Sequence, residues 1–225
     1  MPKAALVTGG SSGIGLAIAR ALREDGYDLT LAARNRERLE TVAAELDAHP
    51  VAVDVTREED CERLVAEHEA RFARLDVLLN SAGVGVGARI EDLATKHWDL
   101  QLGVNLRGAF LVTRFALPLL KQSRGVVVNI ASIAGTMAAP GLAAYGAAKA
   151  GLISLTRSLN AEHQDDGIRA TAICPGFVDT PMAAWTGMAS DEMIQPEDCA
   201  EIVRLLLRLS PRARIPSVVI ERLGA

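Results

Sequence analysis

The chain has 225 residues, of which 49% are hydrophobic and 4% aromatic, and its formal net charge is −4. This length suits one α/β domain, and the many small aliphatic residues suit helices packed on a buried parallel sheet. Acidic and basic residues are interspersed, so we expect no basic stripe for nucleic acid and no polybasic patch for an anionic membrane. The composition predicts one domain, residues 1–225, that binds neither nucleic acid nor membrane.

Cysteines and histidines are spaced in ways that disfavour disulfides and metal sites. The three cysteines are odd in number and lack a Cys-x-x-Cys pair, and the four histidines lack the i, i+4 spacing of a metal-binding helix. The N-terminus enters a strand-like run at once, and no apolar run approaches the ~18 residues of a membrane span. We expect a cytoplasmic protein in a reducing compartment, with no metal.

The first predicted strand, Lys3–Thr8, runs into a glycine-rich turn and then into a helical pattern. Glycines permit a tight turn and a close approach of the backbone, and a helix start offers unpaired N–H groups to a pyrophosphate. An ordinary strand-to-helix loop is the alternative for such a turn taken alone. The candidate cofactor-binding residues here are Gly9, Ser11, Ser12, Gly13, Ile14 and Gly15.

The second predicted strand, Asp28–Ala33, ends at Arg34. A fold that binds NAD would carry an acid here for the ribose 2′-hydroxyl, whereas an arginine suits the 2′-phosphate of NADP. Arg36 and Arg38 follow, so a solvated basic helix start is the alternative. The residue type favours NADP(H) over NAD(H).

The third and fourth predicted strands, Pro50–Val55 and Asp76–Leu79, carry a polar residue close to their carboxyl ends, Asp54 in the first and Asn80 just after the second. Ligands of open α/β sheets bind at this carboxyl edge, so Asp54 could accept a hydrogen bond from an adenine amine. Capping of the next turn by Asp54 explains the residue equally well. The fourth strand leads into Asn80-Ser-Ala-Gly83 and a glycine-rich loop.

A long helix is predicted from about His97 to Gln122, broken or bent near Pro118. Asn105 lies in its interior, where asparagine is a poor residue. It either marks a local distortion that binds water or backbone groups, or is incidental.

The fifth predicted strand, Gly125–Ala131, delivers Ser132, and a predicted helix then carries Tyr145 and Lys149 four positions apart. Residues at this spacing share a helix face. An ammonium near a phenol lowers the phenol pKa, and a serine hydroxyl could hold a substrate oxygen against it. The three groups could exchange a proton with an alcohol oxygen if a cofactor moves the hydride. The alternative is a strand-end serine, a helix-start tyrosine and a solvated lysine.

The rest of the chain continues the alternation of strand and helix. A sixth strand, Ile168–Cys174, is stopped by Pro175-Gly176; a helix runs from Gln195 to about Leu209, and Ser217–Ile220 is a last strand. The pattern predicts a doubly wound (Rossmann) α/β fold, with a parallel sheet of about seven strands and helices on both faces.

These motifs together resemble the short-chain dehydrogenase/reductase family over nearly the whole chain. The resemblance implies that Tyr145 is the general acid or base and that Ser132 orients the substrate oxygen. Lys149 would lower the tyrosine pKa and bind the nicotinamide ribose, and Asn105 would help hold a proton-relay water. The family likeness also implies a homodimer or homotetramer, joined through the helices that contain Asn105 and Tyr145.

The resemblance further implies cofactor contacts along the chain. The glycine turn would hold the pyrophosphate, and the residues after the third and fourth strands would meet the adenosine. The residues after the sixth strand would meet the nicotinamide amide. Beyond the turn and Arg34, the implied contacts are Asp54, Val55, Asn80, Ala82, Gly83, Tyr145, Lys149, Pro175, Gly176, Val178 and Thr180.

Three features depart from the family pattern. Ser81 stands where a second asparagine is usual, and the substrate-covering segment after Thr180 is short. The closing Ile215–Arg222 run replaces the common Val-Asp-Gly-Gly pattern and resembles members that act on 3-hydroxy acids or broad carbonyl compounds. The short segment, with Met182, Trp185 and Met188, would leave an open apolar pocket, unless these residues are plain core packing.

We therefore predict an oxidoreductase that transfers a hydride between NADP(H) and a small-molecule carbonyl or secondary alcohol. A 3-hydroxy-acid dehydrogenase of the same family and another nicotinamide reaction are alternatives within this fold. A protein that senses NADP(H) without turnover is the alternative from another class. The complete set of Ser132, Tyr145 and Lys149 argues against a sensor.

Overall fold

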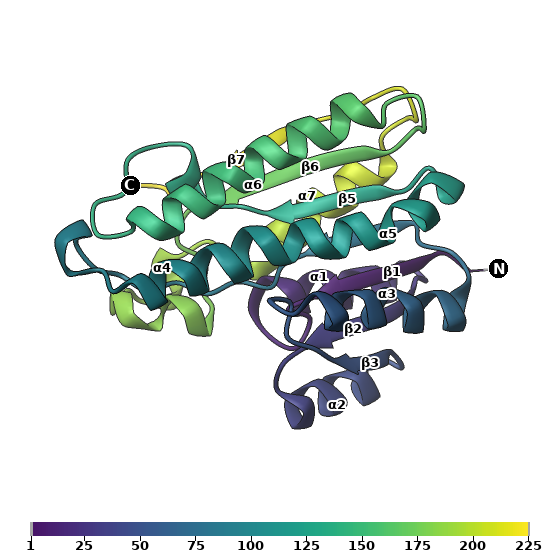
Figure 1. Ribbon diagram of the computed structural model, residues 1–225, viewed down its shortest axis with the longest axis horizontal. Coiled ribbons are helices and arrows are strands. Elements are labelled where there is room, and N and C mark those ends of the chain that lie inside the picture. Colours follow the sequence, from purple (N-terminus) through teal and green to yellow (C-terminus); the bar gives the residue numbers. More distant parts are fainter. Residues whose placement is uncertain (1, 225) are drawn as a thin grey trace.

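The computed structural model describes residues 2–224, and its centre is a seven-stranded parallel sheet (Figure 1). The spatial order is β3-β2-β1-β4-β5-β6-β7, so the winding reverses between β1 and β4. This confirms the predicted doubly wound fold, in which ligands bind at the carboxyl ends of the strands beside the reversal. The strands are β1 Ala4–Thr8, β2 Asp28–Ala33, β3 His49–Ala52, β4 Val77–Asn80, β5 Val126–Ile130, β6 Arg169–Pro175 and β7 Ser217–Ile220.

Helices cover both faces of the sheet (Figure 1). Alternate strand residues serve opposite faces: Val77 and Leu79 of β4 join the apolar cluster beneath α1 and α7, while Leu78 joins the cluster beneath α3 and α5. Because both faces are covered, the strands are apolar at nearly every position. The helices are α1 Gly13–Glu24, α2 Arg36–Glu45, α3 Glu58–Phe72, α4 Thr95–Leu102, α5 Ala109–Ser123, α6 Ala143–Glu162 and α7 Pro196–Arg208.

The long helix predicted between His97 and Gln122 is interrupted. A π-helical segment, η2 Gly103–Gly108, separates α4 from α5, and Asn105 lies inside it. The Asn105 amide donates to the Val84 carbonyl at 2.8 Å and accepts from the Val84 N–H at 2.9 Å. The expected distortion at Asn105 is therefore confirmed, and it binds backbone groups of the loop after β4. A break at Pro118 is wrong, because α5 continues through this exposed residue, whereas a bend there stays a prediction.

The third strand is shorter than predicted and ends at Ala52. The Asp54 carboxylate accepts hydrogen bonds from the Thr56 N–H at 3.0 Å and from the Thr56 hydroxyl at 2.8 Å. These bonds turn the chain out of the sheet and into α3. The capping alternative for Asp54 is thus the one the structure displays.

The three cysteines, Cys61, Cys174 and Cys199, are buried free thiols. Burial raises the pKa of each of these thiols, so all three stay protonated at neutral pH. Among residues 2–224, no helix has both the length and the apolar character required to cross a bilayer.

Candidate active site

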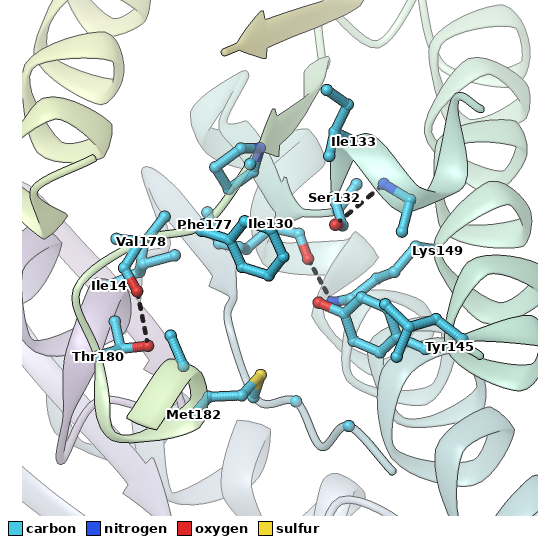
Figure 2. Close-up of a pocket in the computed structure, with 18 of the residues that line it drawn as sticks. Ile14, Ile130, Ser132, Ile133, Tyr145, Lys149, Phe177, Val178, Thr180 and Met182 are labelled. Atoms are coloured by element: carbon cyan, nitrogen blue, oxygen red, sulfur yellow. Dashed lines mark hydrogen bonds between the residues drawn. The ribbon is translucent and has the colours of Figure 1, made fainter. Parts of the chain in front are cut away.

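A cavity of about 750 Å³ lies at the carboxyl edge of the sheet. Its walls come from the turn after β1, the loop after β4, the connection from β5 into α6, and the segment after β6 (Figure 2). The described lining contains one charged side chain, Lys149. The predicted site residues that line this cavity are Gly9, Ser12, Gly13, Ile14, Gly83, Ser132, Tyr145, Lys149, Pro175, Gly176, Val178 and Thr180.

The turn between β1 and α1 requires glycine for two reasons. Gly9 and Gly13 have φ values of 68° and 53°, which side chains disfavour. A Cβ at Gly15 would lie 2.4 Å from the carbonyl oxygen of Gly9, so the helix could not pack this close with any other residue. The Ser12 side chain makes no capping bond, and the first-turn N–H groups have no partner within the helix. This cradle of N–H groups fits the pyrophosphate of a dinucleotide.

Three of the four predicted catalytic side chains, those of Ser132, Tyr145 and Lys149, meet in the cavity (Figure 2). Ser132 follows β5, and its Oγ accepts a hydrogen bond from the Ala134 N–H at 3.2 Å. Tyr145 and Lys149 share one face of α6, with the lysine Nζ 5.4 Å from the centre of the tyrosine ring. The same Nζ donates to the Ile130 carbonyl at 2.7 Å. Strand β5 thus positions Ser132, which follows it closely in the chain, and Lys149, which bonds to the carbonyl of its last residue, Ile130.

Burial dominates the electrostatics of this group. It raises the pKa of the Tyr145 phenol, and the hydrogen bond with Ser132 opposes that effect. Burial also lowers the pKa of Lys149 to about 8. The net direction is opposite to the lowered tyrosine pKa that the sequence predicted, because desolvation of the phenol is the largest influence on it. Tyr145 is a neutral phenol at pH 7, and Lys149 is mostly charged.

Asn80 is buried and lies outside the cavity lining. Its Nδ2 donates to the Thr113 hydroxyl at 3.0 Å and to Asn129 Oδ1 at 2.8 Å. Asn129 in turn donates to the Thr156 hydroxyl of α6 at 2.9 Å. This network ties β4 and β5 to α5 and α6, and so steadies the two elements that carry Ser132 and Tyr145. The predicted adenosine contact of Asn80 stays a prediction.

Arg34 is exposed just beyond β2. The Gly10 N–H donates to the Ala32 carbonyl at 3.2 Å, so the end of β2 is tied to the glycine turn and Arg34 emerges beside it. This location is compatible with a contact to the phosphate side of a bound dinucleotide. The other predicted residues outside the lining are Ser11, Gly15, Asp54, Val55, Ala82 and Asn105.

Sequence reasoning missed most of the cavity wall beyond Ser132. These residues lie in loops without periodicity, and the one available signal was their position next to Ser132 and Pro175. Of the three residues weighed between pocket and core, Met182 and Trp185 line the cavity and Met188 does not. The other wall residues include Ile133, Ala134, Met137, Ala138, Ala139, Leu142, Phe177, Pro181 and Ala183.

The glycine cradle and the serine, tyrosine and lysine group on a doubly wound sheet together define a class of nicotinamide-dependent oxidoreductases. The model of the short chain dehydrogenase family matches residues 3–189. An uncharacterized oxidoreductase of Staphylococcus aureus is 36% identical over 222 residues, which cover 97% of this chain and 96% of that protein. The chain belongs to the short-chain dehydrogenase family.

Solved structures support the same assignment. An alcohol dehydrogenase from the archaeon Thermococcus sibiricus, complexed with 5-hydroxy-NADP, is 32% identical with a TM-score of 0.93, covering 99% of this chain and 97% of that one. A 3-ketoacyl-(acyl-carrier-protein) reductase from Brucella melitensis, complexed with NADH, is 28% identical with a TM-score of 0.89, covering 97% and 96%. The two structures hold different cofactors, so likeness alone does not decide between NADP(H) and NAD(H).

Proposed function

We propose that the protein is an NADPH-dependent reductase of carbonyl compounds that also oxidises secondary alcohols in reverse. The observation that carries the proposal is the meeting of Ser132, Tyr145 and Lys149 in the cavity that also contains the glycine cradle. The fold alone does not specify this chemistry. It is specified by an acid, Tyr145, together with its hydrogen-bonding partner Ser132 and the buried cation Lys149, beside the glycine cradle.

The residues around the cavity fit a nicotinamide dinucleotide. The turn from Gly9 to Gly15 would hold the pyrophosphate, and Arg34 would meet the 2′-phosphate. Asp54, with its neighbour Val55, would contact the adenine, and the segment from Pro175 to Thr180 would meet the nicotinamide amide. When bound, the cofactor supplies the hydride for reduction or accepts it in oxidation.

Side chains of the protein supply the proton for the reduction. Ser132 Oγ and the Tyr145 hydroxyl hold the carbonyl oxygen of the substrate, and the raised pKa keeps Tyr145 protonated and able to donate. As the carbonyl carbon gains the hydride, its oxygen takes the tyrosine proton and the product is an alcohol. The buried ammonium of Lys149 stabilises the phenolate that remains, more strongly than it would in water.

A relay must return a proton to Tyr145 after each turnover. The Lys149 ammonium has three N–H donors, and one of them bonds to the Ile130 carbonyl. The other two can donate to the Tyr145 phenolate and to a water molecule. Both amide atoms of Asn105 already bond to Val84. A relay water at this place would therefore be held by backbone groups of η2, where the π-helical winding disturbs the regular bonding, rather than by the asparagine side chain.

Substitution of the phenol tests this function. Tyr145→Phe should lower kcat for reduction by about 1,000-fold while the Kd for NADPH changes less than about threefold. Tyr27, the other tyrosine in the chain, is buried in the core just before β2, so Tyr27→Phe provides the matched control. Steady-state rates and fluorescence titration of both variants measure the two quantities. Full turnover by Tyr145→Phe would refute the acid-base role, and absence of NADPH binding to the native protein would refute the function.

We also propose a homodimer or homotetramer that uses the face built by α4, α5 and α6. Trp98, Leu100 and Phe110 are exposed apolar residues there, and the exposed Ala147 and Ala150 of α6 permit close helix packing. Sedimentation of the native protein and of Phe110→Glu tests this arrangement. A monomeric native protein would contradict it. Cytoplasmic location remains part of the proposal and rests on the three free thiols.

A further inference from the structure

We propose that the mouth of the cavity selects neutral carbonyl compounds that carry an aromatic ring, an inference that rests on the proposed reductase function. Four large apolar side chains line this cavity and remain exposed: Met137 at 61%, Phe177 at 42%, Met182 at 45% and Trp185 at 70%. Exposed apolar groups gathered at one concave site are typical of a ligand-binding surface. A substrate group that covers these four side chains removes their apolar surface from water, which favours binding.

The two aromatic rings are arranged to receive a third. Phe177 and Trp185 meet edge to face, with ring centres 6.3 Å apart and planes at 72°. This arrangement leaves ring faces open, and an additional ring can stack or pack its edge against them. Thioethers such as those of Met137 and Met182 also make favourable contacts with aromatic rings. In the view of Figure 2, the Phe177 ring is seen between Thr180 and the Ser132, Tyr145 and Lys149 group, and all of these residues line the same cavity.

The aromatic wall is held in place by backbone bonds. The Ile194 N–H donates to the Phe177 carbonyl at 3.0 Å, and the Asp179 N–H donates to the Ile194 carbonyl at 2.9 Å. Trp185 lies on a short 3-10 helix, η4 Pro181–Thr186, whose end is closed by the Thr186 hydroxyl donating to the Ala183 carbonyl at 2.8 Å. The wall is therefore formed before substrate arrives, which reduces the entropic cost of binding.

The opposite wall leaves room beside the catalytic phenol. A Cβ at Gly85 would lie 3.8 Å from the Tyr145 ring, so nothing bulky stands over that ring from the loop after β4. The Ala88 N–H donates to the Gly141 carbonyl at 2.8 Å and joins this loop to the connection before α6. A flat group next to the reacting carbonyl fits between this wall and the aromatic pair.

Charge decides between neutral and anionic substrates. The single charged side chain of the described lining, Lys149, is buried and already donates to the Ile130 carbonyl. A carboxylate at the mouth would lose hydration without gaining a cationic partner, which is costly. The structure therefore disfavours 3-oxo acids and favours neutral aryl ketones.

Substrate pairs test the inference on the native protein with NADPH. We expect kcat/KM for acetophenone to exceed that for 2-hexanone by about tenfold, because an aromatic contact contributes on that scale. Methyl 4-acetylbenzoate and its free acid 4-acetylbenzoate differ chiefly in charge, and the neutral ester should be reduced at least about tenfold better. Equal values within either pair would overturn the inference.

Substitution of Trp185 tests whether this side chain produces the preference for aromatic ketones. Trp185→Leu should lower kcat/KM for acetophenone about tenfold and that for 2-hexanone less than about threefold. Leu205 on α7 is as exposed as Phe177 but lies outside the lining, so Leu205→Ala is the control and should change neither value. Equal losses for both ketones with Trp185→Leu would contradict ring selection. Reduction of no carbonyl at all would overturn the proposed function together with this inference, whereas reduction without ring preference would overturn the inference alone.

Fluorescence supplies a readout apart from turnover. The chain contains two tryptophans, so Trp98→Phe leaves Trp185 as the only one. With saturating NADPH, with which an alcohol cannot react, 1-phenylethanol should change the Trp185 emission in a saturable manner at concentrations about tenfold lower than 2-hexanol. An emission that stays constant with 1-phenylethanol would overturn the placement of the ring beside Trp185.

Discussion

The two ends of the cavity differ in how they are built. At the cradle end, backbone meets backbone: a Cβ at Gly9 would lie 2.8 Å from the Ala82 nitrogen, and one at Gly15 still closer to Gly9. At the mouth, large side chains stand exposed and the glycines have space around them, since a Cβ at Gly87 would find its nearest neighbour at 3.7 Å. The cradle is therefore specified by contacts within the protein, whereas the mouth is completed by contacts with a ligand.

This difference separates what the family shares from what distinguishes one member. A pyrophosphate offers the same oxygens in every dinucleotide, so backbone N–H groups can hold it and side chains would only obstruct. Substrates differ in shape and charge, and only side chains can discriminate among them.

The largest effect should come from filling the cradle. Gly15→Ala should weaken NADPH binding by at least about 100-fold, because its Cβ would force the helix start away from Gly9. Gly87→Ala at the mouth should leave NADPH affinity within about threefold of the native value. Fluorescence titration measures affinity, and thermal unfolding verifies that each variant is folded. Equal NADPH affinity of the two variants would remove the contrast between the ends.

Arg34 extends the cradle with a side chain. Arg34→Asp should shift the ratio of kcat/KM values for NADPH and NADH by roughly 50-fold toward NADH, through loss of a charge-assisted phosphate contact. Arg38→Asp on the exposed surface of α2 is the control for a general change of charge. The same shift in both variants would favour the solvated basic helix start that the sequence left open.

A buried histidine outside the cavity lining joins α3 to β2. His68 of α3 contacts the Thr30 hydroxyl through Nδ1 at 2.8 Å and the Arg74 carbonyl through Nε2 at 2.9 Å. A carbonyl only accepts, so Nε2 carries the proton and Nδ1 accepts from Thr30. Burial lowers the pKa of His68 from 6.5 to about 4. Its stabilising contribution is therefore complete above pH 6.5 and is lost as the pH falls toward 4.

Comparison with His68→Gln isolates this contribution from other titrating groups. At pH 7.5 the substitution should lower the free energy of unfolding by about 2 kcal/mol, because it disturbs two buried hydrogen bonds. At pH 4.5 the difference should be much smaller, since the unfolded chain then binds a proton that His68 takes up in the folded protein only near pH 4. Urea unfolding at the two pH values measures the difference. A constant difference would mean that folding leaves the pKa of His68 unshifted.

The smallest effect is expected from the titration of Lys149, midway between the two ends. Burial lowers its pKa to about 8, so the ammonium that stabilises the tyrosine phenolate is lost above that pH. We expect kcat/KM for ketone reduction to be constant from pH 6 to 7.5 and to fall about tenfold by pH 9. Lys149→Arg keeps its charge and should show lower activity without this decline. A flat native profile to pH 10 would refute the role.

The sequence predicted the cradle end better than the mouth. The order of strands and helices followed from periodicity, and the shared face of Tyr145 and Lys149 followed from helical geometry. Arg34 could be singled out by its place after β2. The interruption at Asn105 was signalled by an amide inside a helical pattern, but its partner, Val84, lies in a distant loop and could not be named. The break considered at Pro118 was wrong, since α5 continues through this residue.

By itself, the sequence determined which chemical groups share an element: glycines at one turn, and Tyr145 and Lys149 on one helix. These relations are local, since backbone geometry alone relates residues a few positions apart. Only the tertiary structure decided how deeply these groups are buried, and so raised the pKa of the phenol that sequence reasoning expected to be lowered. It alone placed Phe177 against Trp185 and committed Asn80 to a buried network. Desolvation and long-range packing depend on every segment at once, and no spacing along the chain encodes them.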